Sequence, residues 1–244
     1  MNSGTPLPRD TETEREKLVE SLFHGTGDTY DKYAHYATWG RDKRWKEELL
    51  GLIECPTRIL DLACGTGILL LEMARRFEVH VTGVELRPEY LDICRVRAQE
   101  GGYDVRTICG NAEDVVLNDH FSHITSCYIP KYIDLDKTVP HLVQMLAPGG
   151  TILMQDFTYP SKKWVRNVFF DHFQRMTERF KEEPDWQHMW SVLPDVIRNS
   201  TWVADMERLF HENGLVDVQV IKQSLGMSCI VTGRSAAEEN TLAQ

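Results

Sequence analysis

The sequence predicts an α/β fold: a doubly wound, seven-stranded and mostly parallel sheet with an antiparallel last strand and a helical cap insertion. Strand-like and helix-like segments alternate over residues 58–156, a glycine turn follows the first strand, and two strand-like runs follow one another near the end of the chain. Alternating strands and helices are typical of a parallel sheet covered on both faces. The 244 residues, of which 42% are hydrophobic, are enough for one such domain.

The parallel part of the sheet is expected from five strands separated by helices. Pro88 suits the first turn of a helix, and the segment 147–150, Ala-Pro-Gly-Gly, suits a helix end and a turn before the fifth strand. After a helix over 201–212, the last two strands are joined by a short turn and are predicted to be antiparallel. We expect strands at 58–62, 79–84, 104–108, 122–128, 150–156, 215–222 and 226–232, and helices at 66–77, 88–99 and 135–146.

The segments outside the sheet are less regular. A single domain is expected over 18–244, after a polar, disordered tail over 1–17 whose last residues already belong to a helical pattern over 11–23. Residues 157–200 lack strand signals and are rich in aromatic residues, several of them at helical spacing. This segment is predicted to form the helical cap.

The bulk composition limits partners and compartment. The formal net charge of −10 argues against a nucleic-acid partner, because phosphate binding needs a basic face. The six cysteines include no Cys-x-x-Cys pair and no cluster has metal-ligand spacing, so we expect free thiols and no metal. No signal peptide opens the sequence and no apolar run reaches about 18 residues, so we predict a cytoplasmic protein with at most peripheral membrane contact.

The most informative motif is the segment 59–67, Ile-Leu-Asp-Leu-Ala-Cys-Gly-Thr-Gly, which predicts a buried strand, a glycine turn and a helix start. Asp61 precedes the turn, and Glu85 ends the next strand-like run. A carboxylate in the position of Glu85 can accept hydrogen bonds from both hydroxyls of a ribose. The motif therefore predicts a site for a nucleoside-bearing cofactor.

Two kinds of cofactor are considered for this glycine turn. A nicotinamide dinucleotide needs a third small residue for close packing of helix and strand, and Leu70 stands there instead. Asp61 would also repel a pyrophosphate, whereas it could accept a hydrogen bond from an ammonium group. S-adenosylmethionine carries an ammonium group, a ribose diol and no phosphate. The residues thus favour S-adenosyl-L-methionine as the cofactor.

The segment 59–67 resembles the first motif of the class I S-adenosylmethionine-dependent methyltransferases, which have a Rossmann-like fold, and further motifs of that class lie over residues 58–232. The resemblance implies a transferase that moves a methyl group. The cofactor-binding residues that we infer from the motif and the resemblance are Tyr30, Asp61, Ala63, Gly65, Gly67, Glu85, Leu86, Asn111, Ala112, Glu113 and Tyr128.

A narrower resemblance covers about residues 20–234. Tyr30-Asp31, the segment 155–160 (Gln-Asp-Phe-Thr-Tyr-Pro) and the last strand are similar to signatures of the ubiquinone/menaquinone C-methyltransferase family. That family methylates a ring carbon of a prenylated quinol, as in menaquinone and ubiquinone biosynthesis. The resemblance implies a lipophilic quinol as the substrate, and it leaves open whether the chain forms a homodimer.

The chain departs from the family pattern at the substrate end. The family carries Phe-Gly-Leu-Arg-Asn after the fourth strand, and this chain has Tyr-Ile-Pro-Lys-Tyr over 128–132. A family histidine before Trp45 is replaced by Asp42. The Arg-Asn pair that the resemblance implies in handling the quinol ring is thus replaced by Lys131 and Tyr132.

The catalytic residues are therefore expected at new positions. We predict that Lys131 stabilises a phenolate and that Tyr132 orients the ring or relays a proton, because class I enzymes place the methyl donor beside the acceptor after strand four. The alternative interpretation is a surface lysine and a packed loop tyrosine. The general base is not identified by the sequence, since a structural or surface role fits each histidine near the predicted cleft better than a catalytic one: His24, His35, His172 and His188.

Three functions remain open. The first is C-methylation of a prenylated quinol, with the aromatic segment 157–190 as a tunnel for the tail instead of a plain cap core. The second is O- or N-methylation of a small metabolite, or another substitution on a quinone with the same cofactor. The third is a non-catalytic protein that binds S-adenosylmethionine.

Overall fold

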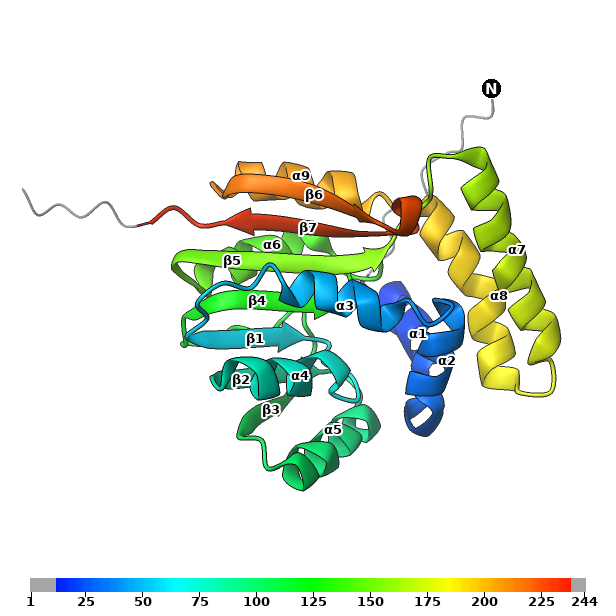
Figure 1. Cartoon of the computed structure of the whole chain (residues 1–244), viewed down its shortest axis with the longest axis horizontal. Helices are drawn as coiled ribbons and strands as arrows, with labels where there is room; N and C mark the ends of the chain where they lie inside the picture. Colours follow the sequence, from blue (N-terminus) through cyan, green and yellow to red (C-terminus); the bar gives the residue numbers. More distant parts are fainter. Residues whose placement is uncertain (1–11, 238–244) are drawn as a thin grey trace, which may run out of the picture.

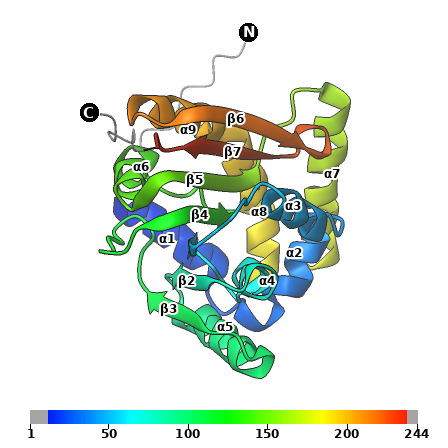
Figure 2. The same cartoon turned by 60° about the vertical axis from the view of Figure 1, so that its left-hand side comes forward.

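The computed structural model describes residues 12–237. Its centre is one seven-stranded sheet with the strand order β3-β2-β1-β4-β5-β7-β6 (Figures 1 and 2). The first five strands pair in parallel, and β7 runs antiparallel to both of its neighbours. The strands are β1 (Arg58–Leu62), β2 (His80–Glu85), β3 (Val105–Cys109), β4 (Phe121–Cys127), β5 (Leu146–Phe157), β6 (Val216–Gln223) and β7 (Ser228–Arg234).

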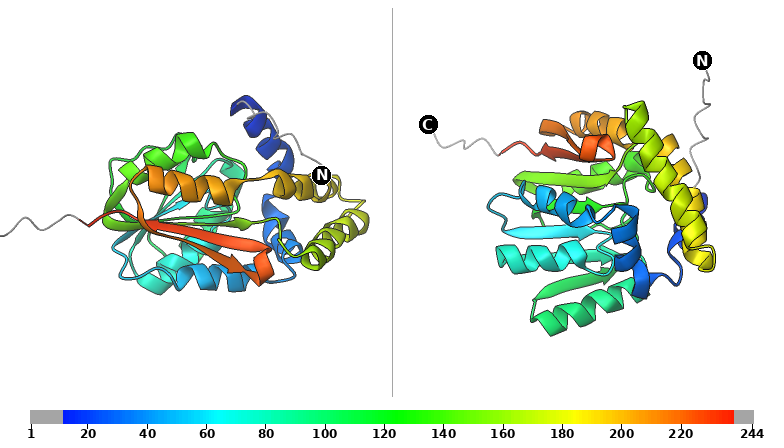
Figure 3. Two further views of the ribbon diagram at one scale, coloured as in Figure 1. Left: turned by 90° about the horizontal axis from the view of Figure 1, so that it is seen from above. Right: turned by 45° about the vertical axis from the view of Figure 1, so that its right-hand side comes forward.

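Helices cover both faces of the sheet (Figure 3). On one face α6 (Leu135–Gln144) and α9 (Trp202–Glu212) bury their apolar side chains against β1, β4, β5 and β7. On the other face lie α3 (Asp42–Leu50), α4 (Ile68–Phe77) and α5 (Pro88–Gly101). The fold class predicted from the alternating pattern is therefore confirmed.

A separate group of helices lies at the carboxyl ends of the parallel strands (Figures 1 and 3). It consists of α1 (Glu12–Phe23), the short 3₁₀ turn η1 (Gly27–Thr29), α2 (Tyr30–Ala37), α7 (Lys163–Arg179) and α8 (Pro184–Asn199). Their aromatic residues form their own buried cluster, apart from the two cores on the sheet faces. A second 3₁₀ turn, η2 (Ser224–Gly226), joins β6 to β7. We call this whole group of helices the cap; it includes the predicted segment 157–200 and also α1, η1 and α2. The cap thus lies over the edge where cofactors bind in doubly wound sheets.

The structure corrects some predicted boundaries. Helix α1 begins at Glu12, so it lies partly inside the segment 1–17 that was predicted as a tail, and residues 1–11 lie outside the described part of the chain. The turn predicted at 147–150 belongs to β5, which begins at Leu146 and carries an irregular register against β4. Backbone bonds, among them Phe121 N–H to Met145 O at 2.8 Å, hold the chain beside β4 from the end of α6 onward.

Leu70, which argued against a dinucleotide, packs fully buried between α4 and the sheet. Space for it comes from Gly83 on β2, where an added Cβ would lie 2.8 Å from Leu70 Cδ1 and 2.7 Å from Cys64 Sγ. The small residue that a dinucleotide site carries on the helix is thus replaced here by a glycine on the facing strand, Gly83. This exchange explains how α4 packs closely without the small residue that a dinucleotide turn carries there. Within residues 12–237 no helix combines the length and apolarity needed to cross a bilayer.

Candidate functional site

Three cavities meet at Tyr30 and Tyr128, above the carboxyl ends of β1, β2 and β4. The central cavity lies over the strand ends, and its walls include Phe23, Ala63, Gly65, Glu85, Leu86, Asn111, Ala112, Glu113 and Tyr132. The inner cavity continues beneath it and is bordered by Lys46, Asp61, Thr66 and Ile68. The distal cavity extends into the cap, between Tyr33, Ala34, Ala37, Lys131, Phe157, Trp186, Met189, Trp190 and Leu193.

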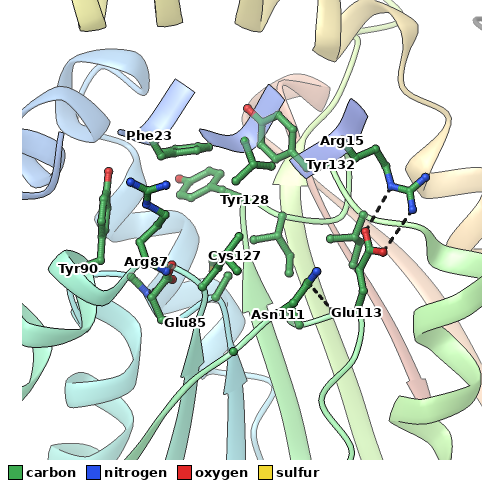
Figure 4. Close-up of a pocket in the computed structure, with 18 of the residues that line it drawn as sticks. Arg15, Phe23, Glu85, Arg87, Tyr90, Asn111, Glu113, Cys127, Tyr128 and Tyr132 are labelled. Atoms are coloured by element: carbon green, nitrogen blue, oxygen red, sulfur yellow. Dashed lines mark hydrogen bonds and ion pairs between the residues drawn. The ribbon is translucent and has the colours of Figure 1, made fainter. Parts of the chain in front are cut away.

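The central cavity gathers ten of the thirteen residues singled out from the sequence (Figure 4). In the close-up Glu85, Asn111 and Glu113 lie along its floor, and Phe23, Tyr128 and Tyr132 form its roof. Of the other three, Asp61 lines the inner cavity and Lys131 the distal one, whereas Gly67 shapes the turn without lining any of the three. The site residues are thus divided among connected spaces.

The turn between β1 and α4 has the backbone that its glycines allow. Gly65 and Gly67 have φ values of +56° and +89°, and Ala63 before them also has a positive φ of 50°. A Cβ on Gly67 would lie 2.7 Å from Cys94 Sγ, so the close approach to α5 requires glycine. A Cβ on Gly110, across the central cavity, would meet only open space. Bare backbone therefore borders the cavity at Gly65 and at Gly110.

Glu85 holds the turn in place from the end of β2. Its Oε2 accepts from Gly65 N–H at 2.9 Å and its Oε1 accepts from Arg87 N–H at 2.8 Å. Burial raises the pKa of this carboxyl, and the backbone donors oppose that rise. A carboxylate has about four acceptor positions, so the backbone donors do not use all of them and a ligand hydroxyl can still donate to it. Glu85 can thus accept from a diol while it fixes the turn.

Asp61 is the second buried carboxyl. It is 2% exposed and accepts a hydrogen bond from Thr125 Oγ1 at 2.7 Å. Burial raises its pKa to about 7, against the opposing effects of Thr125 and Lys46, and the charge of Glu85 adds to the rise. Two carboxyls that are costly to ionise border adjoining cavities. A cationic ligand in the inner cavity would relieve that cost.

Helix α1 closes the central cavity on one side, which the sequence analysis did not anticipate. Arg15 donates to both oxygens of the buried Glu113, from Nε at 3.3 Å and from Nη2 at 3.2 Å (Figure 4). Farther along α1, Glu20 pairs with Arg87. Helix α1 also contributes Phe23 to the roof. Glu113, predicted to bind the cofactor, therefore also fastens α1.

The distal cavity is an aromatic box. The rings of Tyr33 and Trp186 stack with centroids 4.1 Å apart, and Trp186 and Trp190 stack at 5.8 Å. The Tyr33 hydroxyl donates to Glu183 at the start of α8. The indole nitrogen of Trp190 is buried and has no hydrogen-bond partner among residues 12–237. The box suits a flat, apolar ligand with few polar groups.

Lys131 is not the surface lysine that the alternative interpretation expected. Its side chain is 1% exposed, and its Nζ lies 2.7 Å from both Asp156 Oδ1 and the carbonyl oxygen of Tyr128. Burial lowers its pKa, whereas Asp156 raises it. The ammonium also stands 4.2 Å from the centre of the Tyr132 ring. Two of its three N–H groups thus have partners inside the protein.

Tyr128 borders all three cavities, and its hydroxyl is held by a residue that lines none of them. Its hydroxyl donates to Asp42 Oδ1 at 2.6 Å, and Asp42 also pairs with Lys46 one turn further along α3. Burial raises the pKa of Tyr128 well above its ordinary value, and the nearby Asp42 charge adds to the rise. Neither Asp42 nor Lys46 was proposed as a site residue from the sequence.

The four histidines considered as bases lie elsewhere. None of them lines the three cavities in the part of the chain that the structure describes. His172 Nε2 lies 2.8 Å from the carbonyl oxygen of Tyr36, and the exposed His24 pairs with Glu20. Their interactions are those of structural or surface residues.

Comparisons with known proteins agree with this geometry. Residues 59–150 match the model of a family described as a methyltransferase domain. A demethylmenaquinone methyltransferase from Thermus thermophilus is 32% identical over 160 residues, which cover 64% of this chain and 73% of the relative. One from Listeria monocytogenes is 26% identical over 242 residues, with coverages of 94% and 100%. A solved S-adenosylmethionine-dependent methyltransferase from Clostridium acetobutylicum has a TM-score of 0.58 at 17% identity, over 85% of this chain and 99% of the other.

The fold and the strand-end cavities, together with these relatives, define the class. The protein is an enzyme of the class I S-adenosylmethionine-dependent methyltransferases. Within that class the chain belongs to the family of the ubiquinone and menaquinone biosynthesis C-methyltransferases.

The residues present fit the cofactor of this class. Bare backbone at Gly65 and Gly110 leaves room for a nucleoside between them. Buried carboxyls at Asp61 and Glu85 suit an ammonium group and a ribose diol, respectively.

The first prediction concerns Glu85. We expect Glu85→Ala to weaken binding of S-adenosylhomocysteine at least tenfold, because two hydrogen bonds to a charged group contribute about 1.5–3 kcal/mol each. Isothermal calorimetry measures this directly. Glu100→Ala on the exposed face of α5 serves as the control and should leave the affinity unchanged. Equal affinities for the two variants would remove Glu85 from the site.

The second prediction concerns the pH dependence that Asp61 causes. Since its pKa in the folded protein is about 7, the carboxyl is protonated below that pH and must lose a proton to face an ammonium group. Affinity for S-adenosylhomocysteine should therefore rise as the pH rises from about 5 to about 7 and then level off. Without ligand, the same group should make the folded state less stable as the pH rises from about 4 to about 7.

The matched variant is Asp61→Asn, which keeps the shape and removes the titration. Calorimetry at several pH values should give a weaker affinity for this variant with little change across the same interval. A pH dependence identical to that of the unmodified protein would contradict the assignment of Asp61 to the ammonium group.

Proposed function

We propose that this enzyme methylates a ring carbon of a prenylated quinol. The observation that carries the proposal is the aromatic distal cavity, which shares Phe23, Tyr30, Tyr128 and Tyr132 with the central cavity. A flat ring in this cavity would lie next to the cofactor, and its walls are apolar apart from a few groups. The printed names of the relatives from Thermus and Listeria support the same substrate class.

In this proposal each cavity has one task. S-adenosylmethionine supplies an activated methyl group when bound. Glu85 would hold its ribose and Asp61 its ammonium group, so that the reactive end lies near the junction at Tyr30 and Tyr128. Helix α1 would exclude water from the central cavity through the Arg15–Glu113 pair. Alignment of the reacting carbon with the methyl group would then supply much of the rate.

The acceptor ring is proposed to lie between α2 and α8. The stacked Tyr33 and Trp186 would contact one side of it, and Met189 and Leu193 on α8 would line the path of an apolar tail. Lys131 stands at the strand-side wall with one N–H not accounted for by Asp156 and Tyr128. We propose that this donor stabilises the ring oxygen, with Tyr132 orienting the ring beside it.

A second candidate is methylation of an oxygen or nitrogen atom on a smaller aromatic metabolite. It is favoured by the ion pair between Lys131 and Asp156, which holds inside the protein the lysine that replaces the family arginine. Transfer to a heteroatom needs less activation of the ring than transfer to carbon. The position of the new methyl group on the product separates the two candidates.

The third prediction tests the substrate. Incubation of the enzyme with isotope-labelled cofactor and a panel of demethylated naphthoquinols and benzoquinols should give label in the reduced quinols only. We expect NMR of the product to place the methyl group on a ring carbon. Label on oxygen or nitrogen would favour the second candidate, and no transfer to any ring compound would contradict both.

The fourth prediction concerns Lys131. Lys131→Met leaves Asp156 buried without a cation, so we expect a stability loss of about 3–5 kcal/mol together with a large fall in kcat. The paired variant Lys131→Met with Asp156→Asn removes both charges and should regain most of the stability. If Lys131 contacts the acceptor, kcat should stay low in the paired variant.

Denaturant unfolding and steady-state kinetics measure the two effects separately. Lys163→Met, on the exposed start of α7, is the control for loss of a lysine. A paired variant that regains kcat along with stability would mean that the role of Lys131 is structural.

A further inference from the structure

We propose that Tyr128 and Asp42 together withdraw the proton from the ring hydroxyl of the methyl acceptor, with Tyr128 contacting the hydroxyl and Asp42 receiving the proton. The inference rests on the proposed function, because it needs an acceptor that carries a hydroxyl. It names the group that the sequence analysis left open, namely the base.

Tyr128 is placed to contact the acceptor hydroxyl. Its side chain borders the central, inner and distal cavities, so it lies between the cofactor and the acceptor. Its hydroxyl donates its only hydrogen to Asp42 Oδ1 at 2.6 Å. Two lone pairs then remain on the oxygen, and one of them can accept a hydrogen bond from an acceptor hydroxyl. The pair is oriented to pass a proton outward, from cavity to carboxylate.

Asp42 is held where it can receive that proton. Its N–H donates to Thr38 Oγ1 at 3.1 Å, which fixes the start of α3. Its carboxylate pairs with Lys46, and both side chains are nearly buried, at 12% and 10% exposure. The carboxylate therefore sits in a rigid setting with a permanent cation beside it.

The backbone of Tyr128 is shaped for this contact. Tyr128 has a φ of 70°, a conformation that is costly for a bulky residue, and its N–H donates to Gln155 O at 2.8 Å. Strain of this kind persists where the surrounding structure fixes it and is concentrated at functional sites. Here it turns the chain sharply after β4, and the ring lies across the roof of the central cavity (Figure 4).

Both members of the pair are departures from the family pattern noted in the sequence. The resemblance noted in the sequence implies phenylalanine where Tyr128 stands and histidine where Asp42 stands, and this chain has a hydroxyl and a carboxylate there instead. The two changes meet in one hydrogen bond, although they are separated by 86 positions in the chain. The lysine that replaces the family arginine is bound to Asp156. This chain thus has a different set of groups for the same proton.

The step balances in protons and charge. The acceptor O–H bond breaks and its proton bonds to the oxygen of Tyr128, while the original Tyr128 proton moves to Asp42. The products are a phenolate, a neutral Tyr128 and a protonated Asp42. The electron pair left on the phenolate oxygen raises electron density at the ring carbon, which then bonds to the methyl group as the carbon–sulfur bond breaks.

Other charged and titratable groups face Tyr128 and fit this order of events. Lys46 Nζ and Lys131 Nζ lie 4.9 and 5.9 Å from the centre of its ring, and Tyr30 and Cys127 border the same cavities. Burial raises the pKa of Tyr128 well above the ordinary value for a tyrosine. Tyr128 is therefore neutral at neutral pH and acts as a conduit, so that the negative charge passes from Asp42 to the acceptor oxygen as the protons move the other way.

The fifth prediction tests the pair with Asp42→Asn and Tyr128→Phe in the full chain, using 1,4-naphthohydroquinone as the probe. Asparagine can still accept from Tyr128 but cannot take up a proton, and phenylalanine keeps the ring. We expect each variant to lower kcat about 100-fold or more, with the acceptor KM and the calorimetric affinity for S-adenosylhomocysteine within about twofold of the unmodified enzyme. The double variant should lose no more than either single variant.

The pH profile supplies a readout that a structural role would not give. At high pH, near about 10, the quinol ionises by itself, so the rate of Asp42→Asn should approach that of the unmodified enzyme. Glu47→Gln, an exposed carboxyl on the same helix, is the matched control and should keep full activity.

The outcomes separate the two proposals. If the unmodified enzyme methylates the probe and Asp42→Asn keeps its kcat, or loses activity and S-adenosylhomocysteine affinity in parallel, the proton-withdrawing role is overturned and the proposed function stands. If the unmodified enzyme binds S-adenosylhomocysteine but methylates neither this probe nor any other hydroxylated ring, the proposed function is overturned and the inference with it.

Discussion

The constraint on which the structure depends is the burial of two carboxyls, Asp61 and Glu85, at the ends of neighbouring parallel strands. Burial raises the pKa of both, so the folded protein bears a cost that only donors can offset. The backbone N–H of Gly65 supplies part of that compensation, and in doing so it forces the turn after β1 into the shape that exposes bare backbone. The cavity beside this turn is therefore bordered by bare backbone and by two buried carboxyls, which can accept hydrogen bonds from an ammonium group and a diol.

Most of this centre could be predicted because its signals are local. The strand, the turn and the helix after it are contiguous, and Glu85 closes the next strand at a fixed spacing set by one crossover. Parallel pairing then brings Asp61 and Glu85 to the same edge of the sheet. Since hydrophobic periodicity specifies the strands, the fold and the cofactor side of the site follow from the sequence.

The acceptor side could not be predicted in the same way, because its contacts join segments far apart in the chain. The bond between Tyr128 and Asp42 joins the end of β4 to α3, the pair of Lys131 with Asp156 joins the chain after β4 to β5, and the Arg15–Glu113 pair joins α1 to the chain after β3. No spacing in the sequence encodes those distances. Lys131 illustrates the difficulty: its position after β4 is evident from the pattern, whereas its burial against Asp156 depends on the pairing of β4 with β5 and on the residues packed around it.

The two ion pairs that hold α1 beside the central cavity differ in their exposure to solvent. Arg15 fastens the helix to Glu113 on one side of the central cavity, and Glu20 fastens it to Arg87 on the other. Any movement of α1 away from the central cavity must break both ion pairs. Glu20 is 56% exposed, whereas the side chains of Arg15 and Glu113 are 16% and 6% exposed, so dissolved salt screens the Glu20–Arg87 contact more than the Arg15–Glu113 contact.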